Sequence, residues 1–297
     1  MSFDRIISEN LALWREAAAE NRELRLLAVT EAASKAAAEW EAGEADPATW
    51  RIMPPSLSAS PLVPPVAPFA EMLALDEQLA FCRALRALCP RFPHENEESE
   101  VPLPFPAAPR VAMPNGDFFT EALDSFSAVI PHATPLRVQS FSAVLEEVAL
   151  GNADLALLPA EDERGGKRIS LYEECDRLEL HINCVANAPL SEGARQIQLA
   201  LISREATLPF TVLGEEMLEC RIAHEDDRAL ADFLAAAAAC GLTLSRVDSL
   251  PDPHGDSTFA YQAVLAVGGG DAALLEAYMA LRLPRSFVTG RYLCLNS

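Results

Sequence analysis

Hydrophobic and polar positions follow a helical period through the first third of the chain. Over residues 4–43, and again over residues 69–89, apolar side chains recur about every 3.6 positions with charged residues between them. Residues 54–68 contain six prolines, which exclude a helix or a central strand because proline has no backbone N–H to donate. An acidic, proline-rich connector follows the second helical pattern. The pattern therefore predicts a helical domain over residues 1–95.

The most informative stretch of the sequence runs over residues 141–166. Val144 and Val148 belong to an apolar stripe on a short helix, and Gly151 follows it as the glycine that ends many helices in a left-handed conformation. The apolar run 155–158 is typical of a buried strand in a parallel sheet. An acidic loop that ends in two glycines comes next, at the place where open α/β sheets bind their ligands.

Alternating strand and helix patterns fill the remainder. The first group predicts strands at 110–113 and 134–139, a helix between them that runs to residue 129, and strand-like segments at 178–186 and 196–203. The second group predicts strands at 217–223, 242–248, 259–267 and 287–295, with helices at 228–240 and 271–281. We expect an α/β lobe from the first group, and the β-α-β-β-α-β order of the second is ferredoxin-like.

Composition excludes several classes of protein. The formal net charge of −21 disfavours nucleic acid and anionic membrane surfaces, which both require basic side chains. The longest apolar run, residues 233–244, is far shorter than the roughly 20 residues of a membrane span. The N-terminus lacks the apolar segment of a signal peptide. Seven scattered cysteines without C-x-x-C spacing indicate reduced core residues, so we expect a cytoplasmic protein without a metal or other cofactor.

Three segments resemble motifs of the prephenate dehydratase family. The turn at 151–154, Gly-Asn-Ala-Asp, resembles the family's Gly-Glu-Ala-Asp. The loop at 159–164, Pro-Ala-Glu-Asp-Glu-Arg, stands where the family has Pro-Ile-Glu-Asn-Ser-Thr, and it matches at the proline and the first glutamate. The turn at 114–119 is similar to the family's Gly-Pro-x-Gly-Thr-Phe-Ser. The resemblance covers residues 107–297, including a C-terminal ACT regulatory domain over 212–297.

The resemblance implies positions for a substrate site and an effector site. Its substrate-binding candidates are Asn115, Gly116, Glu161, Asp162 and Arg164. The positions of the family's catalytic Thr-Arg-Phe motif hold Ile197, Gln198 and Leu199, of which the first cannot donate a proton and the second carries no charge. The effector-binding candidates, at positions of the Gly-Ala-Leu and Glu-Ser-Arg-Pro motifs, are Ala229, Leu230, Asp248 and Ser249.

A metal site and a chorismate mutase domain are two further possibilities. The acidic run 161–163 offers hard oxygen ligands, but it lacks calcium-loop spacing, so we expect no metal there. In bifunctional members of the family, a chorismate mutase domain occupies the N-terminal position that residues 1–95 have here. Such a domain surrounds a dianion with basic side chains, and the candidates here are Arg5, Arg22, Arg25 and Lys35. The alternative is that these residues form a solvated helix face. Histidine 181, inside a strand-like segment, is expected to be a satisfied core residue.

The resemblance also predicts an architecture with a shortened middle. The family's α/β domain has two lobes of periplasmic-binding-protein type, but only about 34 residues separate positions 163 and 197 here. We therefore expect residues 107–206 to form one such lobe, with most of the second lobe missing. ACT modules pair sheet to sheet, which predicts a homodimer.

Two functions remain open from the sequence. One is a divergent, catalytically impaired relative that acts as a scaffold or responds to a small aromatic ligand such as phenylalanine or prephenate. The alternative is an active dehydratase that converts prephenate to phenylpyruvate, with or without an N-terminal mutase. The replaced Thr-Arg-Phe residues favour the first.

Overall fold

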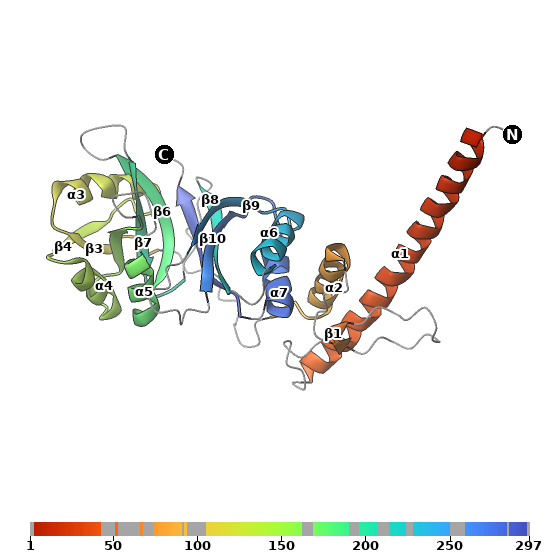
Figure 1. The fold of residues 1–297 in the computed structure, drawn as a ribbon. Helices are drawn as coiled ribbons and strands as arrows, with labels where there is room; N and C mark the ends of the chain where they lie inside the picture. The colour runs from red at the N-terminus through yellow and green to blue at the C-terminus, as the bar shows by residue number, and fades with distance from the viewer. Residues whose placement is uncertain are drawn as a thin grey trace. The chain divides into compact units, whose positions relative to one another are not determined.

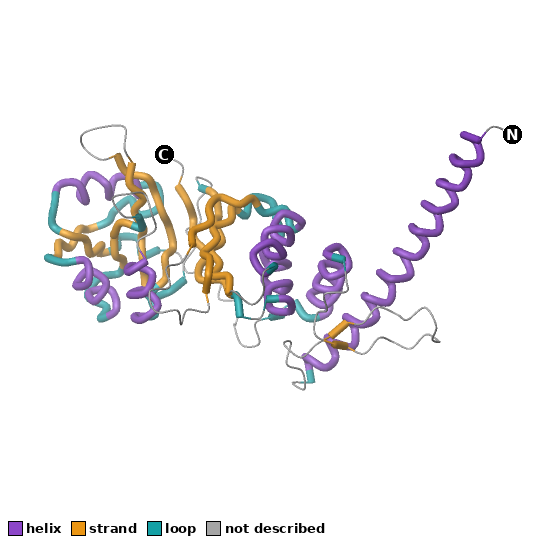
Figure 2. Tube along the Cα trace, viewed as in Figure 1, coloured by secondary structure: helices purple, strands orange, loops and turns teal. Residues whose placement is uncertain are grey.

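A computed structural model gives the fold (Figure 1). It describes residues 3–42, 51–52, 66–67, 74–90, 92–93, 105–161, 169–189, 196–206, 214–223, 228–249, 259–283 and 285–295. The chain divides into two compact units. One consists of residues 1–97, 223–240 and 271–287, and the other of residues 98–222, 241–270 and 288–297. Figure 2 marks the described helices in purple and the described strands in orange.

A nine-stranded sheet in the order β4-β3-β5-β7-β6-β11-β8-β10-β9 organises the second unit. Its strands, in chain order, are β3 (Arg110–Pro114), β4 (Thr134–Val138), β5 (Leu155–Pro159), β6 (His181–Pro189), β7 (Gln196–Ser203), β8 (Glu215–Ala223), β9 (Thr243–Ser249), β10 (Phe259–Ala266) and β11 (Phe287–Leu295). β3 pairs in parallel with β4 and β5, whereas β7 runs antiparallel to both β5 and β6. The fold is therefore mixed α/β, as the alternating patterns predicted, and the antiparallel pairing of β7 makes its sheet a mixed one.

Helices cover both faces of the first five strands. α4 (Phe141–Ala149) and α5 (Ile169–Leu178) pack on one face, where Val144, Val148 and Leu171 join the same core cluster as Ala156 and Leu158 of the sheet. α3 (Asp117–Leu123) and the 3-10 turn η2 (Asp124–Phe126) pack on the other face against the opposite side chains of the same strands. Because both faces are covered, β5 is buried along its whole length, as its unbroken apolar run predicts.

The turn between α4 and β5 is confirmed in detail. Ser140 caps α4, its hydroxyl accepting a hydrogen bond from the Ala143 N–H at 3.2 Å. Gly151 has φ +77°, and its N–H donates to the Val148 carbonyl at 3.0 Å. Asp154 accepts a hydrogen bond from the Arg110 N–H at 2.7 Å, which ties the turn to the start of β3. The residues of this turn therefore set the register of β3 and β5.

Two expectations for the middle of the chain are corrected. Residues 169–178 form helix α5, where the sequence analysis predicted no helix and began a strand-like segment at residue 178. The helical signal was present, because Leu171, Tyr172, Cys175 and Leu178 lie at i, i+1, i+4 and i+7. His181 is exposed at the start of β6 and is not a core residue. It precedes the buried part of the strand, so its side chain stays in water.

The last four strands continue the same sheet. β11 pairs in parallel with β6 over Leu293–Leu295, and beyond it the order is β8, β10, β9. β9 and β10 are antiparallel neighbours. Counted within this segment alone, the strand order is 4-1-3-2. The four strands expected from the sequence are all present, with bounds that differ by two residues or fewer.

The helical unit contains α1 (Phe3–Glu41), α2 (Leu75–Leu88), α6 (Ala229–Ala239) and α7 (Ala272–Arg282), together with a two-stranded pairing of β1 (Arg51–Ile52) and β2 (Val66–Ala67). α1 and α2 contact each other, and the residues buried in this unit include alanines of α1 and Leu79, Phe81 and Leu85 of α2. Arg22 pairs with Asp76, and Arg25 with the buried Glu77 at 2.8 Å. Two of the four basic residues considered for a dianion site are thus ion-paired with α2, whereas the Lys35 side chain is exposed.

All seven cysteines are free, and six of them are buried. Burial raises the pKa of the thiols of Cys82 and Cys184, and it raises that of Cys240 from 9.0 to about 11. Each thiol consequently stays protonated in the folded protein at a pH where the unfolded chain ionises it. Folding stability tied to these groups is complete below about pH 9 and is lost as the pH rises through the folded pKa values.

We expect the free energy of unfolding to fall between pH 9 and pH 11, the window set by the raised pKa of Cys240. Each thiol contributes a slope of about 1.4 kcal/mol per pH unit in that range. Urea denaturation at a series of pH values measures it. The Cys184→Ala variant should show a shallower decline, whatever its stability at neutral pH. A stability that stays level from pH 8 to pH 10 would contradict the expectation.

Candidate functional site

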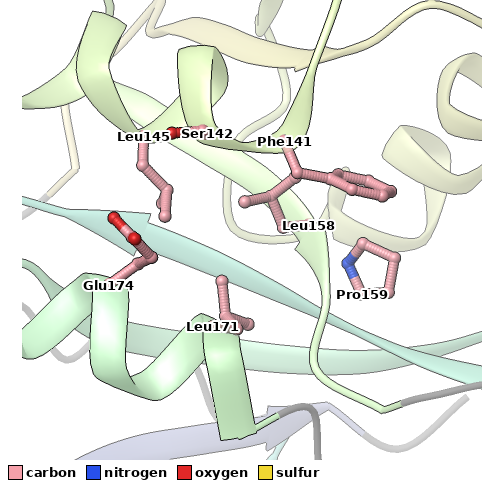
Figure 3. Close-up of a pocket in the computed structure, with 7 residues that line it drawn as sticks. All are labelled: Phe141, Ser142, Leu145, Leu158, Pro159, Leu171 and Glu174. Atoms are coloured by element: carbon pink, nitrogen blue, oxygen red, sulfur yellow. The ribbon is translucent and has the colours of Figure 1, made fainter.

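A pocket of about 330 Å³ lies where β5 ends, between α4 and α5 (Figure 3). It is lined by Phe141, Ser142 and Leu145 of α4, Leu158 and Pro159 of β5, and Leu171 and Glu174 of α5. Its volume falls at the lower end of the range of small-molecule sites. The pocket is at the carboxyl end of β5, the end at which open α/β sheets bind ligands, but none of the predicted substrate-binding residues is among its described lining residues.

Aromatic packing positions the first residue of the pocket. Phe141 is the first residue of α4, and its ring meets that of Phe119 edge-on with 6.4 Å between centroids. Phe119 in turn packs edge-on against Phe118 at 5.2 Å. Such edge-to-face contacts hold rings in a defined orientation. The first turn of α3 therefore supports one wall of the pocket, with Phe119 at the position where the dehydratase motif has serine.

Glu174 is the charged residue among the described residues that line the pocket. Its side chain extends from α5 toward Leu145 of the opposite helix (Figure 3). Arg177, one turn further along α5, donates to Glu174 Oε2 through Nε at 3.1 Å and through Nη2 at 2.5 Å. Both side chains are more than one third exposed, so water screens this pair and it contributes little to stability.

The three positions of the Thr-Arg-Phe motif lie on β7 directly beside this strand end. Leu199 pairs with Pro159, and the Ala160 N–H donates to the Gln198 carbonyl at 2.9 Å. Leu199 is fully buried in the α3-side core, and Ile197 packs against the same cluster. Gln198 alternates with them and belongs to the α4–α5 face. The structure thus brings the predicted catalytic positions next to the predicted loop, but two of the three side chains point into the core.

Arg246 connects two residues that the sequence assigned to different sites. Its Nη1 lies 3.0 Å from Glu161 Oε1, just beyond β5, and its Nε lies 2.7 Å from Asp248 Oδ2 on β9. Burial alone would lower the pKa of Arg246, but the hydrogen bonds and charges of Asp248 and Glu161 outweigh burial and raise it. A substrate candidate and an effector candidate therefore share one guanidinium. Each of the three side chains is less than a third exposed.

A buried carboxylate lies on the same face of the last four strands. Glu219 of β8 is 1% exposed and accepts hydrogen bonds from Gln262 of β10 and from the Tyr292 hydroxyl at 3.2 Å. Burial raises the pKa of Tyr292 and of Tyr172 on α5, and the Glu219 carboxylate adds to both rises. The sequence analysis did not select Glu219. The available signal was its position between the apolar residues Leu218 and Cys220, where a carboxylate needs buried hydrogen-bond partners.

The remaining candidates are placed individually. Asn115 is exposed after β3, its N–H donating to the Val138 carbonyl at 3.1 Å, and Gly116 precedes α3 with φ +147°. Ala229 and Leu230 begin α6 in the helical unit, the first buried and the second half-buried. Ser249 is exposed at the end of β9. Asp162 and Arg164 lie outside the described residues.

The described residues contain neither a metal-binding cluster nor a membrane-spanning helix. Within the described part of the chain, no three histidine, cysteine or acidic side chains gather in a way that would hold a metal ion. Nor does any described helix combine the length and the apolar character needed to cross a bilayer.

Comparisons with known proteins add a structural likeness. No protein-family model matches the sequence, and no curated protein matches it either. Among solved structures, a prephenate dehydratase from Streptococcus mutans aligns with a TM-score of 0.49 at 14% identity, covering 63% of this chain and 99% of that one.

Two other solved structures align similarly. GqqA, described as a novel type of quorum quenching acylase, aligns at 0.48 and 20% identity over 63% of this chain and 95% of that one. A prephenate dehydratase from Arthrobacter aurescens in complex with L-Phe aligns with a TM-score of 0.46 at 17% identity, covering 62% of this chain and 89% of that one. The neighbours thus include prephenate dehydratases, but likeness at this level assigns neither family membership nor activity to this chain.

The Arg246 bridge gives a stability prediction. Arg246→Met leaves Glu161 and Asp248 as neighbouring carboxylates without their shared cation, so we expect a loss of about 1–3 kcal/mol. Chemical denaturation at neutral pH measures it. Arg177→Met, which removes an exposed pair, should cost about 0–1 kcal/mol. Equal losses in the two variants would show that the bridge has no special role.

Proposed function

We propose that this chain binds a small aromatic ligand in the pocket between α4 and α5 and responds to it without dehydrating prephenate. The observation that carries the proposal is the lining of the pocket, in which five of the seven residues are apolar. Phe141 offers a ring face, while Leu145 and Leu171 offer aliphatic contacts from the two helices. Apolar walls with few polar groups are typical of sites for small organic ligands.

The residues beside the pocket do not support dehydration. Expulsion of a hydroxyl group requires a proton donor at the leaving oxygen, and Ile197 at the expected position has none to give. Its side chain packs against the α3-side core rather than facing the α4–α5 side. Prephenate is a dianion, and the Glu174 carboxylate in the lining would repel each of its two carboxylates.

Incubation with prephenate tests the negative part of this proposal. We expect the purified full chain to form phenylpyruvate no faster than the uncatalysed reaction, because the described site lacks a donor at position 197 and carries a negative charge. Absorbance of phenylpyruvate in alkali measures the product. Turnover well above the blank would establish the active dehydratase instead.

Ligand binding tests the positive part. Phenylalanine at about 100 times its dissociation constant would stabilise the native state by about 2.7 kcal/mol, which thermal denaturation detects. Ser142→Trp places a bulky ring in the pocket from an exposed position and should abolish the shift. Glu146→Trp, on an exposed position of the same helix outside the lining, should retain it. An identical response of the two variants would place binding elsewhere.

The last four strands and the two helices between them are proposed to form an ACT-like module that joins two copies of a cytoplasmic chain. The strand order 4-1-3-2 supports this assignment, because it is the order of a ferredoxin-like β-α-β-β-α-β unit. The boundaries 1–95, 107–206 and 212–297 remain part of the same proposal. Sedimentation at micromolar concentration should give a dimer, and a monomer would contradict it.

A further inference from the structure

The charge around the α4–α5 pocket is distributed unevenly. Among its described lining residues, the apolar groups are accompanied by one hydroxyl, on Ser142, and one carboxylate, on Glu174. No arginine or lysine is among the described residues that line the pocket. The Glu174 side chain points toward Leu145 (Figure 3). A bound molecule would therefore meet an apolar surface with a negative charge at one side.

The present partner of Glu174 is easily displaced. Arg177 approaches it from the next turn of the same helix, outside the lining, and its side chain is 57% exposed. An exposed pair of this kind is screened by water, and the arginine regains hydration when it swings away. A cationic group entering the pocket can take the place of Arg177 at little cost, while the ligand's apolar part fills the space beside Leu158 and Leu171.

The charge of the whole chain acts in the same direction. A formal net charge of −21 raises the local concentration of cations and lowers that of anions around the molecule. An anionic ligand would bind more weakly for two reasons, because the net charge repels it during approach and Glu174 repels it in the pocket. A neutral ligand would gain only the apolar contacts.

We infer that the pocket selects a ligand with one ammonium group beside an aromatic or aliphatic body, and that Glu174 is the counter-ion that provides this selectivity. The inference rests on the proposed function, since it names the class of ligand for the same pocket. It predicts that simple aromatic amines bind to the pocket more tightly than zwitterionic amino acids, and that both bind more tightly than aromatic carboxylates such as prephenate.

Three probes of similar shape test the inference by calorimetry with the full chain. They are phenethylamine, 2-phenylethanol and 3-phenylpropionate, which carry a positive, a neutral and a negative end. We expect phenethylamine to bind about tenfold more tightly than the alcohol, the size of one good charge contact, and the acid to bind most weakly.

Two pairs of variants assign the selectivity to residues. Glu174→Gln should weaken phenethylamine binding to the level of the alcohol and leave alcohol binding unchanged, which also shows that the pocket remains folded. Glu173→Gln, an exposed neighbour outside the lining, should change neither. Arg177→Ala should tighten amine binding about twofold to threefold by removing the competitor for Glu174. Arg137→Ala, the same loss of charge at an exposed position on β4, should not.

Each outcome decides between the alternatives. The order amine, alcohol, acid, lost on Glu174→Gln, supports the inference. Equal binding of amine and alcohol, tightest binding of the acid, or weaker amine binding on Arg177→Ala overturns it while the proposed aromatic ligand site stands. Absence of binding by all three probes overturns the proposed function and the inference with it.

Discussion

The hydrogen bonding of β7 between β5 and β6 is the constraint on which the candidate site depends. An antiparallel strand paired on both sides has no freedom to rotate, so its side chains must alternate between the two faces of the sheet. Ile197 and Leu199 consequently face the α3 core, while Ala200 and Ile202 face α4 and α5. A change of register by one residue would exchange these faces, and burial on both faces prevents it.

The pocket forms on one covered face of the sheet, between the helices α4 and α5 at the end of β5. α4 and α5 both pack on β5, yet beside Leu158 and Pro159 they leave a pocket. Its walls are apolar because they continue the core, and its charge comes from Glu174 on the outward part of α5. Binding of an apolar ligand there extends the core, since it removes further apolar surface from water.

Arg246 and Glu219 show how polar groups are accommodated on the same face of the sheet beyond β6. Arg246 pairs with Asp248 on its own strand and with Glu161 just beyond β5, and Glu219 accepts hydrogen bonds from β10 and β11; these partners compensate for the loss of hydration. These contacts also tie the segment after β5 to β9, far apart in the sequence. Positions 161 and 248 were assigned to separate sites because sequence spacing carries no information about such a shared partner.

The sequence by itself determined the elements. The Gly151 turn, the buried run of β5 and the strands and helices after residue 215 follow from local periodicity and backbone preference, which act over a few neighbouring residues. Even helix α5 had its signal at Leu171, Tyr172, Cys175 and Leu178. Only the tertiary structure decided which side chains meet. The union of nine strands in one sheet, the inward direction of Leu199, the Arg246 bridge and the pocket at Glu174 all arise from pairing between distant segments, and the energy of that pairing depends on complete packing rather than on any local pattern.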